Sequence, residues 1–214
     1  MASKVDRLAK ERLLDAAEEL FADKGFEAAS VRDLTARAGC NLAAVNYHFG
    51  GKEQLYRKVF ERRMDILRDV RINAIEKAVN KETKITLEEL LHAFARSFIE
   101  PLLDKKNGNS LMLLMGREMV DPRLPRNLFV EQVVIPTFAV FSRALIQVCP
   151  ALDKIKAQFA IRSIVGQLLH TIQVQRMFTS EDKTNIFITD IDTIVDHIVK
   201  FSAAGIRAYE KEDI

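Results

Sequence analysis

The chain has 214 residues, of which 48% are hydrophobic, and its formal net charge is +2. This length and composition allow a sizeable buried core in one or two domains. The two cysteines are far apart in the sequence, which excludes a disulfide framework and a cysteine-based zinc site. The first residues lack the apolar stretch of a signal peptide, and no apolar run approaches the roughly 20 residues of a membrane span. These features predict a soluble cytoplasmic protein without a membrane partner.

Apolar residues recur with helical periodicity along most of the chain, and strand signals are weak throughout. The sequence therefore predicts an all-α fold of about nine helices. Their approximate ranges are 5–23, 31–38, 42–49, 52–79, 87–103, 110–120, 126–148, 152–178 and 190–209.

Glycine, proline and capping residues mark the expected helix ends. Gly25 is a stop signal for the first helix. Ser30 and Asp33 have the spacing of a capping box that opens the second helix, and Asn41 is placed to cap the third. Pro136 is expected to kink a helix over 126–148 because proline removes a backbone donor. A polar loop is expected over 104–109, and the composition boundary falls at the double glycine after residue 49.

The second and third predicted helices are short and joined by a tight turn, which is the helix-turn-helix pattern. On a helical wheel, the apolar positions that should pack inward are Leu42, Val45 and Phe49. The opposite face carries Tyr47, flanked by Ala43 and Ala44, with Asn46 and His48 at its borders. Small side chains permit close approach to bases, and an alanine methyl can contact a thymine methyl. This face suits the major groove of DNA.

Two basic residues flank that helix in positions suited to the DNA backbone. Arg32 lies in the first turn of the second helix, within reach of a phosphate or a guanine. Lys52 begins the fourth helix, where free backbone N–H groups and the positive end of the helix dipole attract phosphate. The segment thus combines groove reading with backbone clamping.

The segment 39–55, GCNLAAVNYHFGGKEQL, resembles the DNA-binding signature of the TetR family, and the segments 21–26 and 30–34 match its spacing. The likeness covers residues 9–56. It implies a homodimer that represses transcription until a small molecule binds a helical C-terminal domain. Leu42 departs from the polar residue often found at its position, and Asn46 replaces a common tyrosine. The expected DNA-contacting residues are Arg32, Asn41, Ala43, Ala44, Asn46, Tyr47, His48 and Lys52.

The expected organisation is a three-helix helix-turn-helix domain over 1–51 and a helical ligand-binding and dimerisation domain over 52–214. A hydrophobic effector pocket would be built from the apolar residues of the middle helices, although such stripes are more often core. The candidates are Phe94, Phe98, Met115, Met119, Phe141 and His170. For His170 a dimer interface and a satisfied core histidine are alternatives. Arg117 and Glu118 either anchor a charged ligand or face solvent.

The last two predicted helices carry apolar residues on more than one face. A helix that is apolar nearly all round must be covered on several sides. Pairing of these two helices with their symmetry mates in a four-helix interface would cover them, and burial within one subunit is the alternative. The partners expected from the sequence are therefore a double-stranded DNA operator of near-palindromic sequence, a small hydrophobic effector and a second copy of the chain.

Two other functions have some support in the sequence. Glu89 and His92 have the Glu-x-x-His spacing of di-iron helical bundles, but a second copy is missing and Glu89 also completes a capping box with Thr86. No phosphate-binding loop or nucleophile motif is present. A helical lipid carrier would explain the apolar middle but not the first fifty residues. We therefore expect neither an enzyme nor a bound cofactor or metal.

Overall fold

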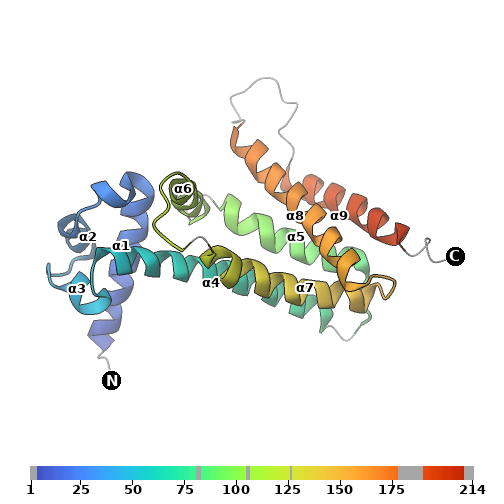
Figure 1. The fold of residues 1–214 in the computed structure, drawn as a ribbon, viewed down its shortest axis with the longest axis horizontal. Helices are drawn as coiled ribbons and strands as arrows, with labels where there is room; N and C mark the ends of the chain where they lie inside the picture. Colours follow the sequence, from blue (N-terminus) through green and yellow to red (C-terminus); the bar gives the residue numbers. More distant parts are fainter. Residues whose placement is uncertain (1–3, 81–82, 105–106, 126, 178–189, 210–214) are drawn as a thin grey trace. The chain divides into compact units, whose positions relative to one another are not determined.

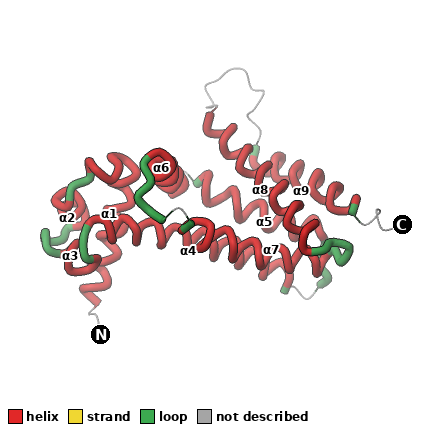
Figure 2. Tube along the Cα trace, in the orientation of Figure 1, coloured by secondary structure: helices red, strands yellow, loops and turns green. Residues whose placement is uncertain are grey.

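The computed structural model describes residues 4–80, 83–104, 107–125, 127–177 and 190–209. Within these ranges the chain is helical and contains no strand, which confirms the predicted all-α fold (Figure 2). The helices are α1 (Lys4–Ala28), α2 (Val31–Ala38), α3 (Ala44–Phe49), α4 (Lys52–Val79), α5 (Leu87–Leu103), α6 (Asn107–Val120), η1 (Val130–Val134), α7 (Ile135–Val148), α8 (Lys154–Met177) and α9 (Ile191–Ala208). None of the described helices is both long and apolar enough to cross a bilayer.

The chain forms two compact units (Figure 1). Unit 1 comprises residues 1–66 and 104–132, and unit 2 comprises residues 67–103 and 133–214. The first part of α4 and all of α6 therefore belong with α1, α2 and α3. The boundary expected at residue 51 lies inside unit 1. Unit 1 extends beyond that residue because α6, which is distant in sequence, packs against α1.

Unit 1 is held together by α1, whose apolar face packs on α2, α3 and α6. Leu13 and Phe21 of α1 are fully buried with Leu34 of α2 and Val45 of α3. The ring of Phe21 lies edge-on to that of Tyr56 in α4, with 5.0 Å between centroids. This core fixes the two helices of the helix-turn-helix against a longer one, which a helix as short as α3 needs to be stable.

The helices of unit 1 begin and end close to the residues that were predicted to mark their ends. Gly25 has φ +81°, so the regular helix is interrupted there although the helical turn resumes to residue 28. Ser30 and Asp33 form the predicted capping box at the start of α2. The capping role of Asn41 was wrong: α3 begins at Ala44, its N-cap is Ala43, and that cap makes no side-chain hydrogen bond.

Unit 2 is built on α5, which packs against α7, α8 and α9, while α8 also packs against α7 and α9 (Figure 1). The predicted capping box at the start of α5 is present. The backbone N–H of Thr86 donates to Glu89 Oε2 at 2.8 Å, and the backbone N–H of Glu89 donates to Thr86 Oγ1 at 3.2 Å. Residues of the α5 core include Leu90, Leu91 and Ile99, which are almost completely buried.

Two predicted helix boundaries of the middle of the chain were shifted. The helix expected to start at residue 110 begins at Asn107, so the polar loop is shorter than expected. The expected kink within 126–148 is a π-helical segment, Val130–Val134, followed by α7 with Pro136 in its first turn. Proline is tolerated there because the N–H groups of a first turn have no intrahelical acceptor. The predicted ends at residues 126 and 178 lie outside the described residues.

Candidate functional site

The helix-turn-helix is formed by α2 and α3 with residues 39–43 as the turn. Gly39 has φ +62°, a left-handed conformation that favours glycine, and its N–H donates to the carbonyl of Ala36 at 3.2 Å. The N–H of Cys40 donates to the carbonyl of Thr35 at 2.9 Å. These bonds end α2 sharply and direct the chain into α3. The sequence therefore sets the turn through one glycine and the backbone bonds it allows.

The outer surface of the turn and α3 presents several of the residues expected to contact DNA. Tyr47 is 76% exposed, and Ala43 and Asn46 are also exposed. His48 is half-buried, and its ring lies edge-on to that of Tyr47 with centroids 4.8 Å apart. A large aromatic side chain exposed to this extent contributes little to the core, so its position is consistent with an intermolecular contact.

The wheel placement was wrong for two residues. Leu42 was expected to pack inward but is 61% exposed, and Ala44 was expected on the outer face but is 7% exposed. The reason is that Leu42 precedes the helix, so a wheel drawn from residue 42 does not apply to it. Val45 is completely buried as predicted, and Phe49 is half-buried. The exposed surface therefore consists of Leu42 and Ala43 in the turn and Asn46 and Tyr47 in the helix.

The two expected backbone-contacting cations differ in their surroundings. Arg32 is exposed in the first turn of α2. Lys52, in the first turn of α4, is half-buried; its ammonium donates to the carbonyl of Glu27 at 3.4 Å and lies 4.3 Å from the ring centroid of Phe26. An ammonium has three donors, so this contact positions Lys52 and leaves donors for a phosphate. Asn41 is exposed in the turn.

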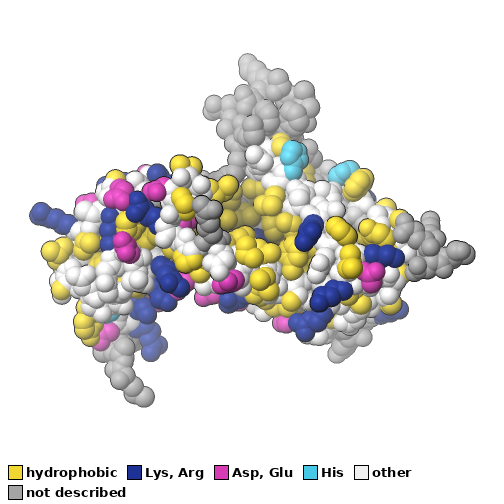
Figure 3. All heavy atoms as spheres, in the orientation of Figure 1, with side chains coloured by type: hydrophobic (Ala, Val, Ile, Leu, Met, Phe, Trp, Pro, Cys, Tyr) yellow, Lys and Arg dark blue, Asp and Glu magenta, His cyan; other side chains and the backbone are white. Residues whose placement is uncertain are grey.

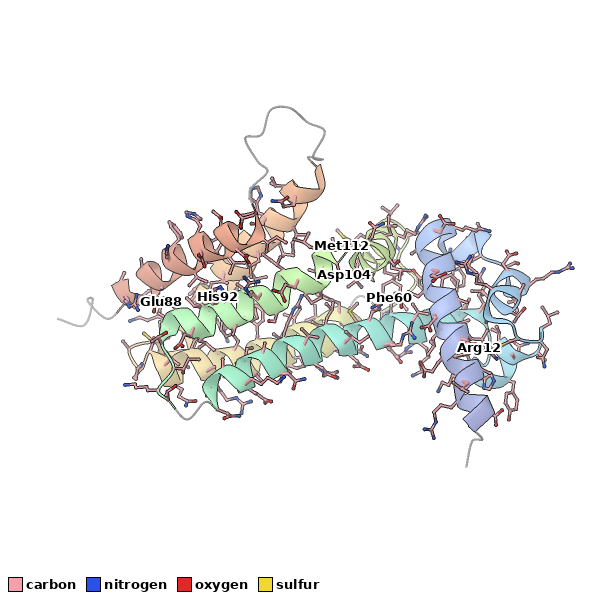
Figure 4. The ribbon with its side chains drawn as sticks, turned by 180° about the vertical axis from the view of Figure 1, so that it is seen from behind. Arg12, Phe60, Glu88, His92, Asp104 and Met112 are labelled. Carbon is pink, nitrogen blue, oxygen red and sulfur yellow. The ribbon has the colours of Figure 1, made fainter. Side chains whose placement is uncertain are left out.

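Two of the effector candidates line a cavity inside unit 1. Met115 is half-buried and Met119 is 85% exposed on α6. Both contribute to an apolar cavity of about 500 Å³, together with Phe60 of α4 (Figure 4) and residues of the segment after α6. Pockets for small molecules measure roughly 300–1,000 Å³, so this cavity has the size and lining of a hydrophobic ligand site.

The other effector candidates lie in unit 2. Phe94 and Phe98 of α5 and Phe141 of α7 are buried, and the rings of Phe94 and Phe141 stack with centroids 4.0 Å apart. They form an aromatic cluster that belongs to the core. His170 is exposed on α8. The structure therefore does not bring the six predicted residues into one site.

Arg117 and Glu118 have structural partners in unit 1. Arg117 donates to the carbonyls of Ala22 and Asp23 at 3.1 and 2.6 Å, and so satisfies acceptors near the end of α1, whose last turn has no basic residue. Glu118 accepts a hydrogen bond of 2.9 Å from the hydroxyl of Tyr56. Burial, and then this bond, raises the pKa of Tyr56. The sequence predicted either a ligand anchor or exposure to solvent for these two residues, and it did not predict these contacts within unit 1.

One charged residue of unit 2 was missed by the sequence reasoning. Arg71 of α4 is only 5% exposed. A signal for its burial exists: Leu67, Arg71 and Ile75 recur every four residues, and both apolar neighbours are buried. An arginine within an apolar helical stripe is the exception that such a pattern singles out.

Two family models match the sequence of this chain. Residues 13–59 match the bacterial regulatory proteins of the tetR family, and residues 87–206, more than half of the chain, match the C-terminal domain of the HTH-type transcriptional dual regulator CecR. The chain belongs to the TetR family. The first match covers the helix-turn-helix just described, and TetR-family membership makes the chain a DNA-binding transcriptional regulator.

Full-length relatives of this TetR-family chain are regulators as well. The transcriptional dual regulator CecR of Shigella flexneri is 27% identical over 90% of this chain and 92% of its own length. The transcriptional activator FasR of Mycolicibacterium smegmatis is 24% identical over 91% and 81%. The crystal structure of a TetR-family regulator from Mesorhizobium loti MAFF303099 has a TM-score of 0.72 at 17% identity, covering 97% of this chain and 98% of that one, and shows the shared fold.

The residues of the enzyme rival have other partners in this TetR-family fold. Glu89 is part of the capping box of α5. His92 lies one turn from Glu88 on the same helix (Figure 4), with Nε2 3.7 Å from Asp196 of α9. Among the described residues no group of three or more histidine, cysteine or acidic side chains could hold a metal ion. The relatives are regulators, and the chain is a regulator of the same family.

Proposed function

We propose that the protein represses transcription as a homodimer bound to a near-palindromic operator, and that a small hydrophobic effector releases it from the DNA. The observation that carries this proposal is the exposed outer surface of the helix-turn-helix, with Tyr47 as its most prominent side chain. In this proposal the protein acts in the cytoplasm. The relatives named above support DNA-binding regulation as the function of the whole chain.

In this proposal α3 enters the major groove. Tyr47 and His48 donate to base edges or phosphates, and the small side chain of Ala43 allows close approach to the bases. Arg32, Asn41, Asn46 and Lys52 hold the DNA backbone on either side. Ala44 leaves the predicted set of contacts because it is buried. Two copies related by twofold symmetry place their recognition helices in successive major grooves about 34 Å apart, or a multiple of that distance.

A test of this arrangement is the variant Lys52→Ala. Because a phosphate contact reads no sequence, we expect it to weaken binding to an operator and to an unrelated duplex by the same factor. It should also reduce the slope of log affinity against log salt by about two for a dimer with one contact per subunit. Fluorescence anisotropy at several salt concentrations measures both. A loss confined to the operator would contradict the phosphate role, and wild-type protein that binds no duplex at low salt would contradict the proposed function.

The exposed surface of α8 and α9 supports the homodimer. Phe159 and Leu169 of α8 and Phe201 of α9 are each more than half exposed. Apolar side chains are exposed next to histidine side chains over these helices in Figure 3. Large apolar side chains gathered on one surface mark an interaction site. We propose that this surface pairs with its copy in a second chain, which covers faces that packing within unit 2 leaves exposed.

The variant Phe201→Glu tests the dimer. Burying a carboxylate in the apolar interface of both subunits should weaken association more than about a hundredfold. Because Phe201 is 66% exposed, the monomeric variant should still fold, with the helical content of the wild type. Sedimentation velocity across a concentration series measures the shift, with Val120→Glu, exposed in unit 1, as the control that stays dimeric. An unchanged dimer in Phe201→Glu would show that another surface pairs the subunits.

The effector has two apolar regions in which to bind. One is the cavity of unit 1 lined by Met115 and Met119, and the other is the buried aromatic cluster of Phe94, Phe98 and Phe141 in unit 2, whose rings must move apart to admit a ligand. In either case the effector shifts the protein toward the state that does not fit the operator, and only by its difference in affinity for the two states.

A further inference from the structure

The stripe of α4 that faces the interior of unit 2 contains one charged residue. Leu67 and Ile75 lie four residues before and after Arg71, and these three side chains are 3%, 0% and 5% exposed. Arginine is almost never this deeply buried without a partner, because taking a charge out of water is costly. The position therefore needs an explanation beyond packing.

The guanidinium of Arg71 lies on an aromatic ring, and no counter-charge is found for it in the part of the chain that the structure describes. Its central carbon lies 4.0 Å from the ring centroid of Phe98. Its Nε is buried and has no hydrogen-bond partner among the described residues. Burial lowers the pKa of Arg71 to about 10, so the side chain still carries its charge at neutral pH. The site thus holds a charged guanidinium whose Nε–H is not used.

Other arginines of unit 2 show what a satisfied partner set looks like in this fold. Arg96 donates to Glu100 at 2.8 Å and also pairs with Asp192 of α9. Arg207 of α9 pairs with Glu88 of α5 at 2.5 Å. These pairs lie at the surface, where they contribute little. Among the arginines that the structure describes, Arg71 is the one that is buried, and burial is where a partner is needed most.

A second orphaned polar group belongs to the same unit. The hydroxyl of Thr137 on α7 is buried and has no hydrogen-bond partner among the described residues. Thr137 precedes Phe141 by one helical turn, and Phe141 stacks on Phe94, which is one turn from Phe98 on α5. An arginine of α4 with an unused Nε–H therefore lies against one ring of the cluster, and a hydroxyl without a partner lies one helical turn from another ring on α7.

We infer that the effector is an amphipathic anion whose carboxylate or phosphate oxygens bind Arg71 and whose apolar part packs against Phe98. This inference rests on the effector response in the proposed function and names its chemical class and its site. The planar fork of a guanidinium matches two oxygens of such a group, and the resulting charge-assisted hydrogen bonds are strong. An uncharged hydrophobic molecule of the same shape leaves the buried cation unpaired and binds more weakly.

The experiment compares three probes of one chain length below their micelle concentrations: decanoate, decyl phosphate and the uncharged decanol. We expect both anions to raise the melting temperature of the wild-type protein and to bind more tightly than decanol in calorimetric titrations, by about tenfold or more. The ratio between the two anions tells a carboxylate effector from a phosphate one. In Arg71→Met the preference for anions should disappear, and in the control Arg143→Met, an exposed arginine of α7, it should remain.

The ligand-free variant provides an independent reading. If Arg71 is an unpaired buried cation, Arg71→Met removes a cost and the melting temperature should stay equal or rise. A marked fall would show that Arg71 is a structural residue and overturn the inference. Equal binding of decanol and the anions would also overturn the inference, as would the absence of a shift in melting temperature with either anion. A third contradicting result is anion binding that survives Arg71→Met but is lost when Met115→Trp fills the cavity of unit 1. DNA binding of Arg71→Met should match the wild type, and failure of the wild type to bind DNA would instead contradict the proposed function.

Discussion

Tyr47→Ala is expected to lower the operator affinity of the dimer by at least about thirtyfold, since each of the two subunits loses a base contact worth roughly 1–3 kcal/mol and 1.4 kcal/mol is tenfold. The side chain is 76% exposed on the outer face of α3, so its removal leaves no cavity. The melting temperature and the dimer should therefore stay unchanged. Anisotropy titrations of operator DNA, with thermal unfolding of the same samples, measure the two quantities separately.

Tyr47→Phe is the matched control for this variant. It keeps the ring, including its edge-on contact with His48, and removes only the hydroxyl. A loss shared by both variants assigns the contact to a hydrogen bond, whereas a loss in Tyr47→Ala alone assigns it to the ring. Full affinity in Tyr47→Ala would mean that α3 meets the DNA through another face.

Glu18→Ala should destabilise the protein by about 1.5–3 kcal/mol, because it removes a buried carboxylate that accepts charge-assisted hydrogen bonds from two half-buried arginines. Glu18 of α1 is 5% exposed. It accepts hydrogen bonds from Arg62 at 2.8 Å and from Nε of Arg63 at 2.7 Å, both on the unit 1 part of α4. Urea unfolding monitored by circular dichroism measures the change in the free energy of unfolding.

The neighbouring Glu19 supplies the comparison for this prediction. Its side chain is 54% exposed and pairs with Arg37 at 2.5 Å. An exposed ion pair contributes roughly 0–1 kcal/mol, so Glu19→Ala should change stability far less. If the two variants unfolded at the same urea concentration, the buried cluster around Glu18 would not be what ties α1 to α4.

Helices and their capping residues could be predicted because they depend on residues close in sequence. The capping boxes at Ser30 and Thr86 and the left-handed end of α2 at Gly39 are local devices. Val45 and Tyr47 were also oriented correctly, because both lie inside α3, where helical periodicity applies. The family resemblance rested on these same residues, so the function class followed from the first quarter of the chain.

The remaining features depend on contacts between residues far apart in sequence. Arg117 is committed to the end of α1, ninety-four and ninety-five positions away, and Glu118 to Tyr56, sixty-two positions away. Neither partner can be inferred from periodicity. The start of α3 was predicted too early because Asn41 has the side chain of a typical N-cap. In the structure the backbone N–H groups of Gly39 and Cys40 bond back to α2, and the turn continues to residue 43. Arg71 was missed because an arginine in a helix is normally assigned to solvent.

The central claim, that the protein reads DNA as a symmetric dimer through α3, is tested most directly by selecting binding sites from a random duplex library. We expect one enriched near-palindromic sequence, bound by two chains, with affinity that falls steeply as salt increases. The selection is repeated with decanoate and decyl phosphate present, so that a regulator that binds DNA only with an anion is also detected. No enriched sequence under any of these conditions, or an enriched site without twofold symmetry bound by a single chain, would contradict the claim.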